Sequence, residues 1–515
     1  SVGETSGDDA TETGALDPTS GTPSDTEQGA DSSGTESSDD QASPPPLPYA
    51  RDIRIPRLTA NQGVQVTLVD NGVEIAGEDY NTRIITGRRT LIRGFWSLRA
   101  DFEPRTLIGR LTLDYEDGTQ INQDYEVMVT GDSGDGGASF QWLLEPDQVV
   151  PGIRFRARVL EVDEDQGGGV VADPPPITPL AGRGELSVYD VPLQMRVILV
   201  PVQHEFEGCT MTPEPTDDDV DVMRQQLEQS NPIQEAIVEL GEPMLYTEAI
   251  GTAGEAFSGV LGALVAHRAT IQPADNVYLY GLLDPCDGFP PGLLGQAIGI
   301  PGEPLPELAA QRISTGRWRG SGLATSETFV HEVGHTQGRR HVFCSGGEAG
   351  IDSAYPHEGG RIGVWGFGIH DFILRTPTGA RDYMTYCSNE WVSDYAWEQT
   401  LEVIEQLTSW DTQRPPAAPQ GELLIGSVLP DGRTRWWTSR GDLDPTRLPS
   451  PHQLHLSIDG TSVAVATTTQ PQPDGPGTTV IARLPESWTR ATSMRLSGPG
   501  LAMTIAPSTV RRSAR

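Results

Sequence analysis

One short run of histidines constrains this chain more than any other feature. Residues 328–341 read Thr-Phe-Val-His-Glu-Val-Gly-His-Thr-Gln-Gly-Arg-Arg-His. If His331 and His335 lie on one helix, both imidazoles leave the same face one turn apart, and they can bind one zinc ion at about 2.0–2.1 Å. Gly338 permits a sharp turn at the end of that helix, and the turn can bring His341 back to the same ion.

The sequence predicts a catalytic metal site rather than a structural one. Three protein ligands leave a fourth position open for water, which is typical of catalytic zinc. Glu332 follows the first histidine directly and can reach such a water. The alternative is a chance pattern on an ordinary core helix. Five specified positions, three of them the rare histidine, argue against this alternative.

The run H-E-x-x-H-x-x-G-x-x-H resembles the extended zinc motif of the metzincin metallopeptidases. Metzincins also need a methionine turn downstream, and residues 381–387, Arg-Asp-Tyr-Met-Thr-Tyr-Cys, resemble one. The resemblance implies that Met384 lies beneath the zinc as an apolar floor. It also implies that Tyr386 can approach the metal and stabilise the oxyanion, as in astacins and serralysins. The chain matches none of the astacins, serralysins or pappalysins in detail, and we expect an unassigned bacterial branch.

By this resemblance we expect a zinc-dependent endopeptidase that is a monomer and acts on polypeptides. Zinc would lower the pKa of a bound water towards about 7, and Glu332 would take the water proton and pass it to the leaving amine. Two other classes stay open. One is an inactive metzincin-like adhesin or binding protein, and the other is a zinc hydrolase of a non-peptide amide.

The composition excludes some partners. The 515 residues carry a net charge of −36 with a pI of about 4.5, which argues against nucleic acid and anionic membrane surfaces. No stretch holds eighteen apolar residues, so we expect no transmembrane helix. No signal peptide is present, and we expect Ser1 to be the start of a processed chain.

Residues 1–48 form an acidic segment rich in Ser, Thr, Gly and Asp, without a positive charge. Such a composition cannot bury enough apolar surface to offset the entropy of ordering, so we expect a disordered tether. It resembles the stalk of bacterial surface lipoproteins, whose lipid-bearing cysteine would have to precede Ser1. A plain solvated tail is the alternative. The tether and the peptidase resemblance place the protein outside the cell or on the bacterial surface.

Four cysteines allow three disulfide pairings. Cys344 follows the third histidine and Cys387 follows the methionine turn. If both segments lie under the zinc, these two are candidates for one disulfide, which leaves Cys209 and Cys286 for the second. Four buried thiols in a reducing compartment are the alternative, and a Cys/His structural zinc site is disfavoured because no C-x-x-C spacing occurs.

No cysteine precedes residue 209, so a cysteine from the N-terminal region cannot block the zinc. Any latent form must use another group. The remaining histidines are not at ligand spacing, and we expect surface or supporting positions for them: His204, His267, His357, His370, His452 and His455.

The predicted fold class is multidomain, with an α+β metzincin domain at residues 191–412. Residues 49–190 show short alternating strands around Asn71-Gly72 and Asp117-Gly118, which predict a β-sandwich. Its role stays open between binding module, pro-region and spacer. Residues 413–515 predict a small C-terminal β-domain. Linkers are expected at residues 163–180 and after residue 412.

Within residues 191–412 the expected elements alternate between strands and helices. Residues 195–202 and 276–283 are apolar strands, and residues 312–319 would be the edge strand that holds substrate. One helix is capped by Thr216 and another covers residues 253–268. The zinc helix is expected to begin at Thr325 or Ser326, and Ser393 caps the last helix.

Overall fold

The computed structural model describes residues 47–162, 173–250, 256–289, 292–346, 348, 350–412, 421–443, 450–465, 467–475 and 477–512. The predicted tether at residues 1–48 lies almost wholly outside the described residues, as do parts of both predicted linkers. The chain divides into two compact units. Unit 1 comprises Ser1–Val191 and Val364–Gly379, and unit 2 comprises Pro192–Gly363 and Ala380–Arg515. The domain boundaries drawn from the sequence remain a prediction.

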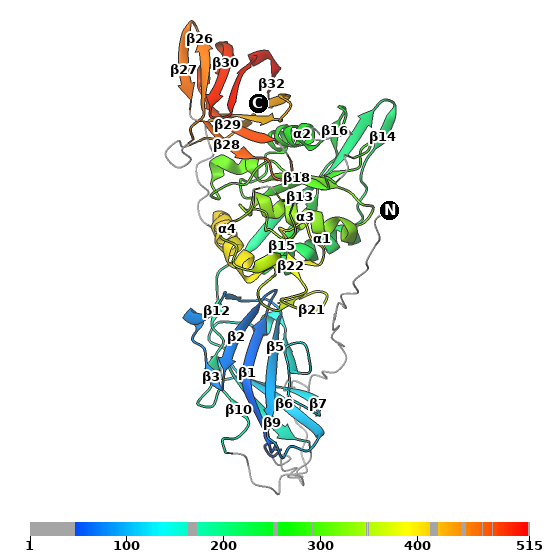
Figure 1. The fold of residues 1–515 in the computed structure, drawn as a ribbon, viewed down its shortest axis with the longest axis vertical. Coiled ribbons are helices and arrows are strands. Elements are labelled where there is room, and N and C mark those ends of the chain that lie inside the picture. The colour runs from blue at the N-terminus through cyan, green and yellow to red at the C-terminus, as the bar shows by residue number, and fades with distance from the viewer. Residues whose placement is uncertain are drawn as a thin grey trace, which may run out of the picture. The chain divides into compact units, whose positions relative to one another are not determined.

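Unit 1 is built from β-sheets (Figure 1). One sheet has the order β3-β2-β1-β5-β8, and a second has the order β10-β9-β6-β7 with β11 beside β9. Strands β12 and β4 form a small parallel pair. The strands are β1 (Ile53–Asn61), β2 (Gln65–Asp70), β3 (Val73–Glu74), β4 (Ile84–Ile85), β5 (Thr90–Leu98), β6 (Arg105–Asp114), β7 (Gln120–Val129), β8 (Phe140–Leu144), β9 (Arg154–Glu161), β10 (Ile177–Thr178), β11 (Gly184–Glu185) and β12 (Val188–Tyr189).

The two larger sheets of unit 1 share one apolar core. Leu58 and Trp142 from the first sheet and Leu111 and Phe155 from the second belong to the same buried cluster. The two sheets approach each other closely at Gly109 of β6. Its carbonyl accepts a 3.0 Å hydrogen bond from the indole Nε1 of Trp142 on β8. The alternation of more and less buried residues along β8 and β9 therefore arises from one shared core.

The turns of unit 1 follow the predicted chemistry. Asn71 and Gly72 both have positive φ, 50° and 78°, and they join β2 to β3. Gly118, with φ of 89°, joins β6 to β7. Positive φ at both central residues suits the twist of a two-residue hairpin, so the Asn-Gly hairpin prediction is confirmed.

A segment between the zinc motif and the methionine turn belongs to unit 1. It carries β20 (Gly366–Phe367) and β21 (Leu374–Arg375), which pair with each other. The Phe367 N–H donates to Gly63 O at 3.1 Å. The Phe367 ring is fully buried in a cluster with Leu91, Ile369 and Leu374. The chain thus leaves unit 2 after Gly363 and returns at Ala380.

Unit 2 is organised around a mixed sheet of order β14-β13-β17-β19-β18, with β15 and β16 also paired to β13. The pairs β13–β17 and β17–β19 are parallel, whereas β18 runs antiparallel to β19. The strands are β13 (Gln194–Phe206), β14 (Cys209–Met211), β15 (Glu235–Leu240), β16 (Met244–Tyr246), β17 (Tyr278–Leu283), β18 (Gly295–Ala297) and β19 (Ile313–Arg317). The two predicted apolar strands are confirmed as β13 and β17. The predicted edge strand is wrong: β19 lies inside the sheet, and β18 is the outer strand.

Four α-helices are described, all in unit 2: α1 (Asp217–Ser230), α2 (Ala256–Ile271), α3 (Gly322–Thr336) and α4 (Asp394–Thr412). Thr216 caps α1 as predicted, since its hydroxyl accepts from the Asp219 N–H at 3.2 Å. Ser393 caps α4 in the same way through the Ala396 N–H at 3.0 Å. The predicted first residues of α2, 253–255, lie outside the described residues.

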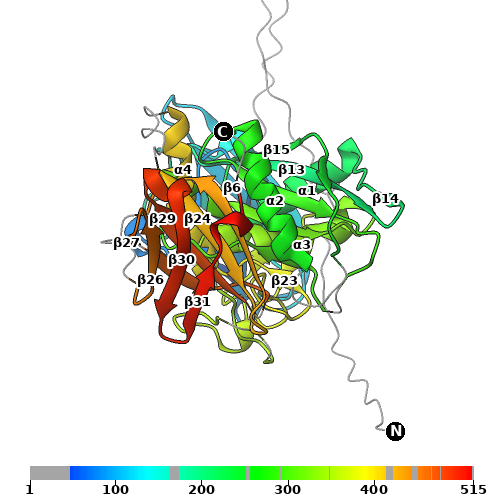
Figure 2. The ribbon, with the colours of Figure 1, turned by 90° about the horizontal axis from the view of Figure 1, so that it is seen from above.

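Two further sheets complete unit 2 (Figure 2). They have the orders β28-β29-β24-β25-β32 and β27-β26-β30-β31. Ile425, Trp437 and Ile481 of the first of these sheets are buried in one cluster with Phe257 and Leu264 of α2. The strands of these two sheets are β24 (Glu422–Val428), β25 (Thr434–Arg440), β26 (Gln453–Ile458), β27 (Thr461–Val465), β28 (Thr467–Pro471), β29 (Thr478–Leu484), β30 (Ala491–Gly498), β31 (Leu501–Ile505) and β32 (Val510–Arg511). Unit 2 also contains a separate parallel pair, β22 (Arg381–Asp382) and β23 (Glu390–Trp391).

The predicted fold class, an α+β metzincin domain with flanking β-domains, was wrong. The described chain is mostly β, with 32 strands in many sheets against four α-helices. No pattern in the sequence indicates that the C-terminal strands share a core with α2. Apolar alternation predicts a strand but does not say which surface covers it.

Candidate metal centre

The zinc motif lies on α3, which begins earlier than predicted. Ser321 is the N-cap, and its Oγ accepts from the Ala324 N–H at 3.2 Å. The predicted caps, Thr325 and Ser326, lie inside the helix, where their hydroxyls donate to Ser321 O and Leu323 O. The hydroxyls of Thr and Ser can donate to a backbone carbonyl of the preceding helical turn. Either residue can therefore lie inside a helix and does not by itself mark the start of one.

Gly338 ends the helical segment as the sequence predicted. Its φ is +89°, and its N–H donates to His335 O at 2.9 Å. The chain then reverses, and the next N–H, of Arg339, donates to Gly334 O at 3.0 Å. This reversal brings His341 back beside the helix, with its Nε2 atom 3.1 Å from that of His335. The three motif histidines are therefore together.

Backbone carbonyls fix the orientation of two of the histidines. His331 Nδ1 lies 2.7 Å from Tyr383 O, and His335 Nδ1 lies 2.8 Å from Arg339 O. A carbonyl can only accept, so each Nδ1 carries a proton and Nε2 is the atom that can present a lone pair to a metal. Both Nε2 atoms face the third histidine, and all three rings are buried. This is the arrangement in which imidazoles bind a metal through Nε2.

A fourth group, absent from the sequence prediction, completes the cluster. The Asp474 carboxylate lies 3.0 Å from the Nε2 atoms of both His335 and His341 and 3.6 Å from that of His331. It also accepts a hydrogen bond from the hydroxyl of Tyr386. Asp474 follows His341 by 133 residues and lies in the turn between β28 and β29. Its Pro-Asp-Gly context marks a turn, but no ligand spacing links it to the motif.

These four side chains can hold one metal ion. Their ligand atoms all lie within 4.8 Å of one another. The Nε2 atoms of His335 and His341 lie 3.1 Å apart, and His331 Nε2 is buried without a hydrogen-bond partner among the described residues. A metal ion bound between the three Nε2 atoms would give each of them a partner. Ligands of a tetrahedral zinc, each about 2.0–2.2 Å from the metal, are separated by roughly 3.3 Å, close to the distances here.

The pKa shifts in the cluster favour an uncharged His335 beside an ionised Asp474. Burial lowers the pKa of His335 to about 4. Burial alone would raise the pKa of Asp474, but the three imidazoles hold it well below its ordinary value. Charged His335 is therefore disfavoured at neutral pH, while the carboxylate stays ionised. Three nitrogen lone pairs and one negative oxygen form a donor set for a divalent cation.

Glu332 lies beside the cluster and against strand β18. Burial, and secondarily the charge of Asp474, raise the pKa of Glu332 well above its ordinary value. The Ala297 N–H donates to its carboxylate. Gly295 allows this approach, because a Cβ there would lie 2.5 Å from Glu332 Oε1. The helix, the outer strand and the general-base candidate thus meet at one place.

A cavity of about 550 Å³ opens beside these groups. Its lining includes His331, Glu332, Tyr386 and Asp474, together with Gly295 of the outer strand. Tyr386 is half-exposed, with a relative accessibility of 48%. Its ring centroid lies 4.8 Å from that of His341. The predicted base, the predicted oxyanion partner and two of the metal-binding side chains therefore line one space.

Met384 is fully buried against α3, while its predicted role as an apolar floor beneath a zinc ion stays a prediction. A Cβ on Gly334 would be 2.7 Å from its sulfur. The methionine turn is held by Asp382, a residue that the sequence analysis missed. Asp382 Oδ1 accepts from the Met384 N–H at 3.0 Å, and its Oδ2 accepts from Ser393, the cap of α4.

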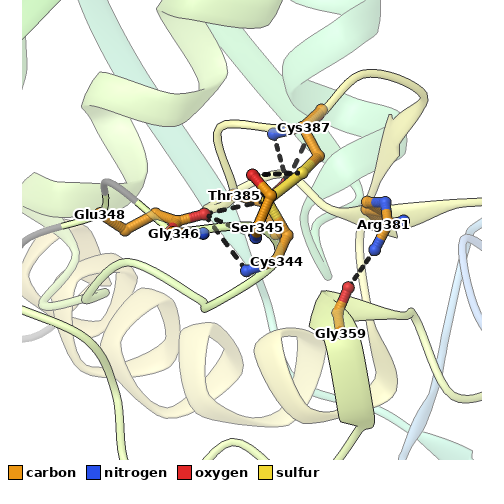
Figure 3. The surroundings of a disulfide bond; sticks show 8 residues. All are labelled: Cys344, Ser345, Gly346, Glu348, Gly359, Arg381, Thr385 and Cys387. Atoms are coloured by element: carbon orange, nitrogen blue, oxygen red, sulfur yellow. Dashed lines mark hydrogen bonds between the residues drawn. A yellow bond between two sulfur atoms is a disulfide. The ribbon is translucent and has the colours of Figure 1, made fainter.

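Two disulfides are present, with the predicted pairing of Cys344 to Cys387 and Cys209 to Cys286. The first joins the segment after His341 to the end of the methionine turn, and Figure 3 shows its surroundings. Glu348 accepts from the backbone N–H groups of Cys344 and Gly346. Burial alone would raise the pKa of Glu348, but these N–H groups hold it below its ordinary value. Because both sulfurs are bonded to each other, this group is not a second metal site.

None of the other described histidines joins the metal cluster. His357 Nε2 lies 2.7 Å from an oxygen of Asp394. His204 is not a surface residue: it is fully buried, and its Nε2 lies 2.9 Å from Glu248 O. Its Nδ1 accepts from the Cys286 N–H, beside the second disulfide. His204 therefore has a supporting role beside the second disulfide.

No family model matches the chain, and no curated protein matches it. Within the described part of the chain, none of the helices has the length and apolar character that a membrane crossing requires.

Proposed function

We propose that this chain is an exported zinc-dependent endopeptidase whose metal site resembles that of metzincins. One observation carries the proposal. The cluster of three histidines lies beside a cavity that His331, Glu332 and Tyr386 line and that an outer sheet strand borders. The arrangement combines a metal site, a base and a surface on which an extended chain can lie.

His331, His335 and His341 would hold the metal, and zinc suits three imidazole nitrogens with a tetrahedral preference. When bound there, zinc lowers the pKa of a coordinated water and polarises a carbonyl. The other tasks fall to side chains. Glu332 takes a proton from the attacking water and passes it to the leaving amine, a role that gains from a pKa raised towards the working pH. The Tyr386 hydroxyl is placed to donate to an oxyanion at the same position.

An extended substrate would pair with β18. This strand is the last one of its sheet among the described residues, and its other side is bound to β19. Backbone pairing at a sheet edge gives affinity with little demand on side-chain sequence. The edge adjoins Glu332 directly, since the Ala297 N–H of β18 donates to that carboxylate. A peptide on this edge would pass beside the metal-binding histidines.

The two disulfides support export, because such bonds persist in oxidising compartments. The acidic segment before residue 47 lies outside the described residues. Anchoring at a bacterial surface through a lipidated residue before Ser1 therefore rests on composition alone, as part of this proposal.

A second candidate is a binding protein in which the metal has a structural role. Asp474 favours this alternative, because four protein ligands with no open position characterise structural zinc. The placement of Glu332 favours the peptidase. A carboxyl group buried against the centre, with one oxygen unpartnered among the described residues, has no evident structural purpose.

The test compares wild type with Glu332→Gln after zinc reconstitution, with casein as substrate. We expect chelator-sensitive cleavage by wild type and a fall of kcat/KM by about 10²–10⁴-fold in the variant, because general acid–base catalysis contributes this much. Zinc content should be equal in both, since Glu332 is not a ligand. Equal activity in the two proteins would refute the role of Glu332. Cleavage of small acyl amides but not of casein would favour the non-peptide hydrolase.

A further inference from the structure

We propose that Asp474 is a fourth protein ligand that closes the metal centre of the resting protein, and that the β28–β29 turn must leave β18 before substrate enters. This inference rests on the proposed function, since it concerns the regulation of the same site. It assigns a role to a part of the chain that shows no chemistry in its sequence. We refer to residues 472–475 and Gly477 below as the closing turn.

The contacts of Asp474 are those of a ligand and not of a surface carboxylate. Its side chain is about 8% exposed and faces all three histidines at 3.0–3.6 Å. A carboxylate at this place occupies the position that a catalytic water or a substrate carbonyl would need. The same carboxylate accepts the Tyr386 hydroxyl. The Asp474 carboxylate therefore occupies the open position at the metal and also binds the Tyr386 hydroxyl, the proposed oxyanion donor.

The closing turn also lies against the proposed substrate edge. The side chain of Gln296, in the middle of β18, donates to Pro473 O at 3.2 Å. Gly475 follows so closely that a Cβ there would lie 2.5 Å from Gln296 Nε2. Beyond the turn, the Thr479 hydroxyl donates to Ile298 O at 2.9 Å, one residue past β18. A peptide added to β18 would meet this turn.

The topology allows the turn to move without unfolding the sheet. Strand β28 is the outermost strand of its sheet and pairs only with β29. The turn is joined across its base by Gln472 N–H to Gly477 O at 2.9 Å. Displacement of β28 and the turn would break the β28–β29 ladder, the contacts to Gln296 and the hydrogen bonds that Thr467, Thr469, Gln470 and Gln472 make outside that ladder. The apolar cluster that packs β24 and β25 against α2 would stay intact.

Asp474 would also keep the protein latent in the absence of a cysteine that could bind the metal. Residues 1–208 contain no cysteine, so a thiolate from this part of the chain cannot block the metal. A carboxylate from the C-terminal sheets blocks it instead. Release of Asp474 would open a metal position and free the Tyr386 hydroxyl in one step.

The test uses Asp474→Gly and Asp474→Asn in the full chain. Asp474 has a φ of +55°, which glycine and asparagine tolerate, so neither variant strains the turn. Asp431→Asn is the matched control, because Asp431 is an exposed aspartate in the β24–β25 turn of the same sheet. Thermal unfolding establishes that each variant is folded.

Three readouts are measured: zinc affinity by competition with a chromophoric chelator, binding of acetohydroxamate to the zinc-loaded protein, and cleavage of casein. We expect Asp474→Gly to weaken zinc binding by about 10-fold or more, because one ligand is lost. If the open form is about 1–10% populated in wild type, acetohydroxamate should bind about 10–100-fold more tightly to the variant and kcat/KM should rise by a similar factor. Asp474→Asn should lie between, and Asp431→Asn should match wild type.

The outcomes separate this inference from the proposed function. Unchanged zinc and acetohydroxamate affinities in Asp474→Gly would overturn the closing role, whatever the protein cleaves. If both affinities shift as expected but Asp474→Gly and its Glu332→Gln double variant are equally inactive on casein, closure stands and the peptidase proposal fails. If wild type and Asp474→Gly cleave casein equally and Glu332→Gln does not, the peptidase stands and closure fails.

Discussion

Gly334 lies directly on Met384: a Cβ at residue 334 would be only 2.7 Å from the methionine sulfur. Gly334 occupies the helix position just before His335, so the methionine turn packs against the backbone that carries the metal-binding histidines. Tyr383, the neighbour of Met384, holds His331 through its carbonyl. The helix and the turn therefore form one unit whose spacing depends on the absence of a side chain at residue 334.

Gly334→Ala should disturb that spacing. An added methyl in a packed interior costs about 1–3 kcal/mol of unfolding free energy, even though alanine favours a helix over glycine. We expect a lower Tm and weaker zinc binding, because His331 and His335 shift together. Gly302→Ala is the control, since a Cβ there meets nothing within 4 Å. A Gly334→Ala protein as stable as wild type would show that Met384 yields without cost.

Asp382 should position the metal-binding histidines without touching the metal. Asp382→Ala removes the acceptor of the Met384 N–H and of the Ser393 hydroxyl, both in a buried place. Buried groups left without partners cost about 1–3 kcal/mol, and loss of support around a metal ligand typically weakens metal binding about 10–100-fold. Asp382→Asn should restore most of both, because its amide oxygen can still accept from Met384.

Asp411→Ala serves as the matched control for Asp382→Ala, since Asp411 lies on the exposed side of α4 and pairs with Arg196 at 3.5 Å. The measurements are Tm and chelator competition for zinc. Equal zinc affinity in Asp382→Ala and wild type would refute the positioning role, even if stability falls.

The parts of the site that could be predicted depend on local spacing. Histidines four residues apart must share a helix face, and a glycine at residue 338 must allow the reversal. These rules act within a few residues, so the sequence was sufficient. Asp474 could not be predicted, because its approach depends on how a sheet formed by residues far along the chain packs within unit 2. The role of Asp382 was missed for the same reason, because one of its partners is Ser393, the cap of the following helix.

The fold was less predictable than the site for a related reason. Helix α2 is apolar over more than one face, and the sequence cannot say what covers each face. In the structure Gly262 of α2 lies against Trp437 of a C-terminal strand, where a Cβ would be 3.1 Å from the indole ring. The short outer strand β18 has only three residues, too few for a periodic signal. Strand predictions were therefore correct where the alternation of apolar and polar residues was long. They failed where tertiary packing decides the position of a short strand.

Removal of either disulfide should destabilise the protein by a similar amount but affect the metal differently. Closed loops with separations of 43 and 77 residues correspond to about 4 kcal/mol each by chain entropy. The Cys344→Ala, Cys387→Ala pair should also weaken zinc binding, because that bond joins the segment after His341 to the methionine turn. The Cys209→Ala, Cys286→Ala pair should leave zinc affinity nearly unchanged. Equal losses of zinc affinity in the two double variants would contradict this assignment.

Glu390 should make the metal-free protein less stable as the pH rises. Burial, and then the charges of Glu327 and Asp382, raise the pKa of Glu390 to about 9 in the folded protein, against about 4.5 unfolded. Between these values the folded state holds a proton that the unfolded state has released. The stability contributed by this protonated carboxyl is therefore complete below about pH 4.5, and it is lost progressively until the pH passes about 9.

Glu390→Gln removes this dependence and keeps the shape of the side chain. We expect the variant to match wild type near pH 4.5 and to exceed it by about 1–3 kcal/mol near pH 8. Denaturant unfolding of chelator-treated protein at several pH values measures the difference. Glu327→Gln is the control, and it should narrow the gap only slightly, because its charge is a secondary cause of the raised pKa. A constant difference between wild type and Glu390→Gln from pH 5 to 9 would show that Glu390 is ionised in the folded protein.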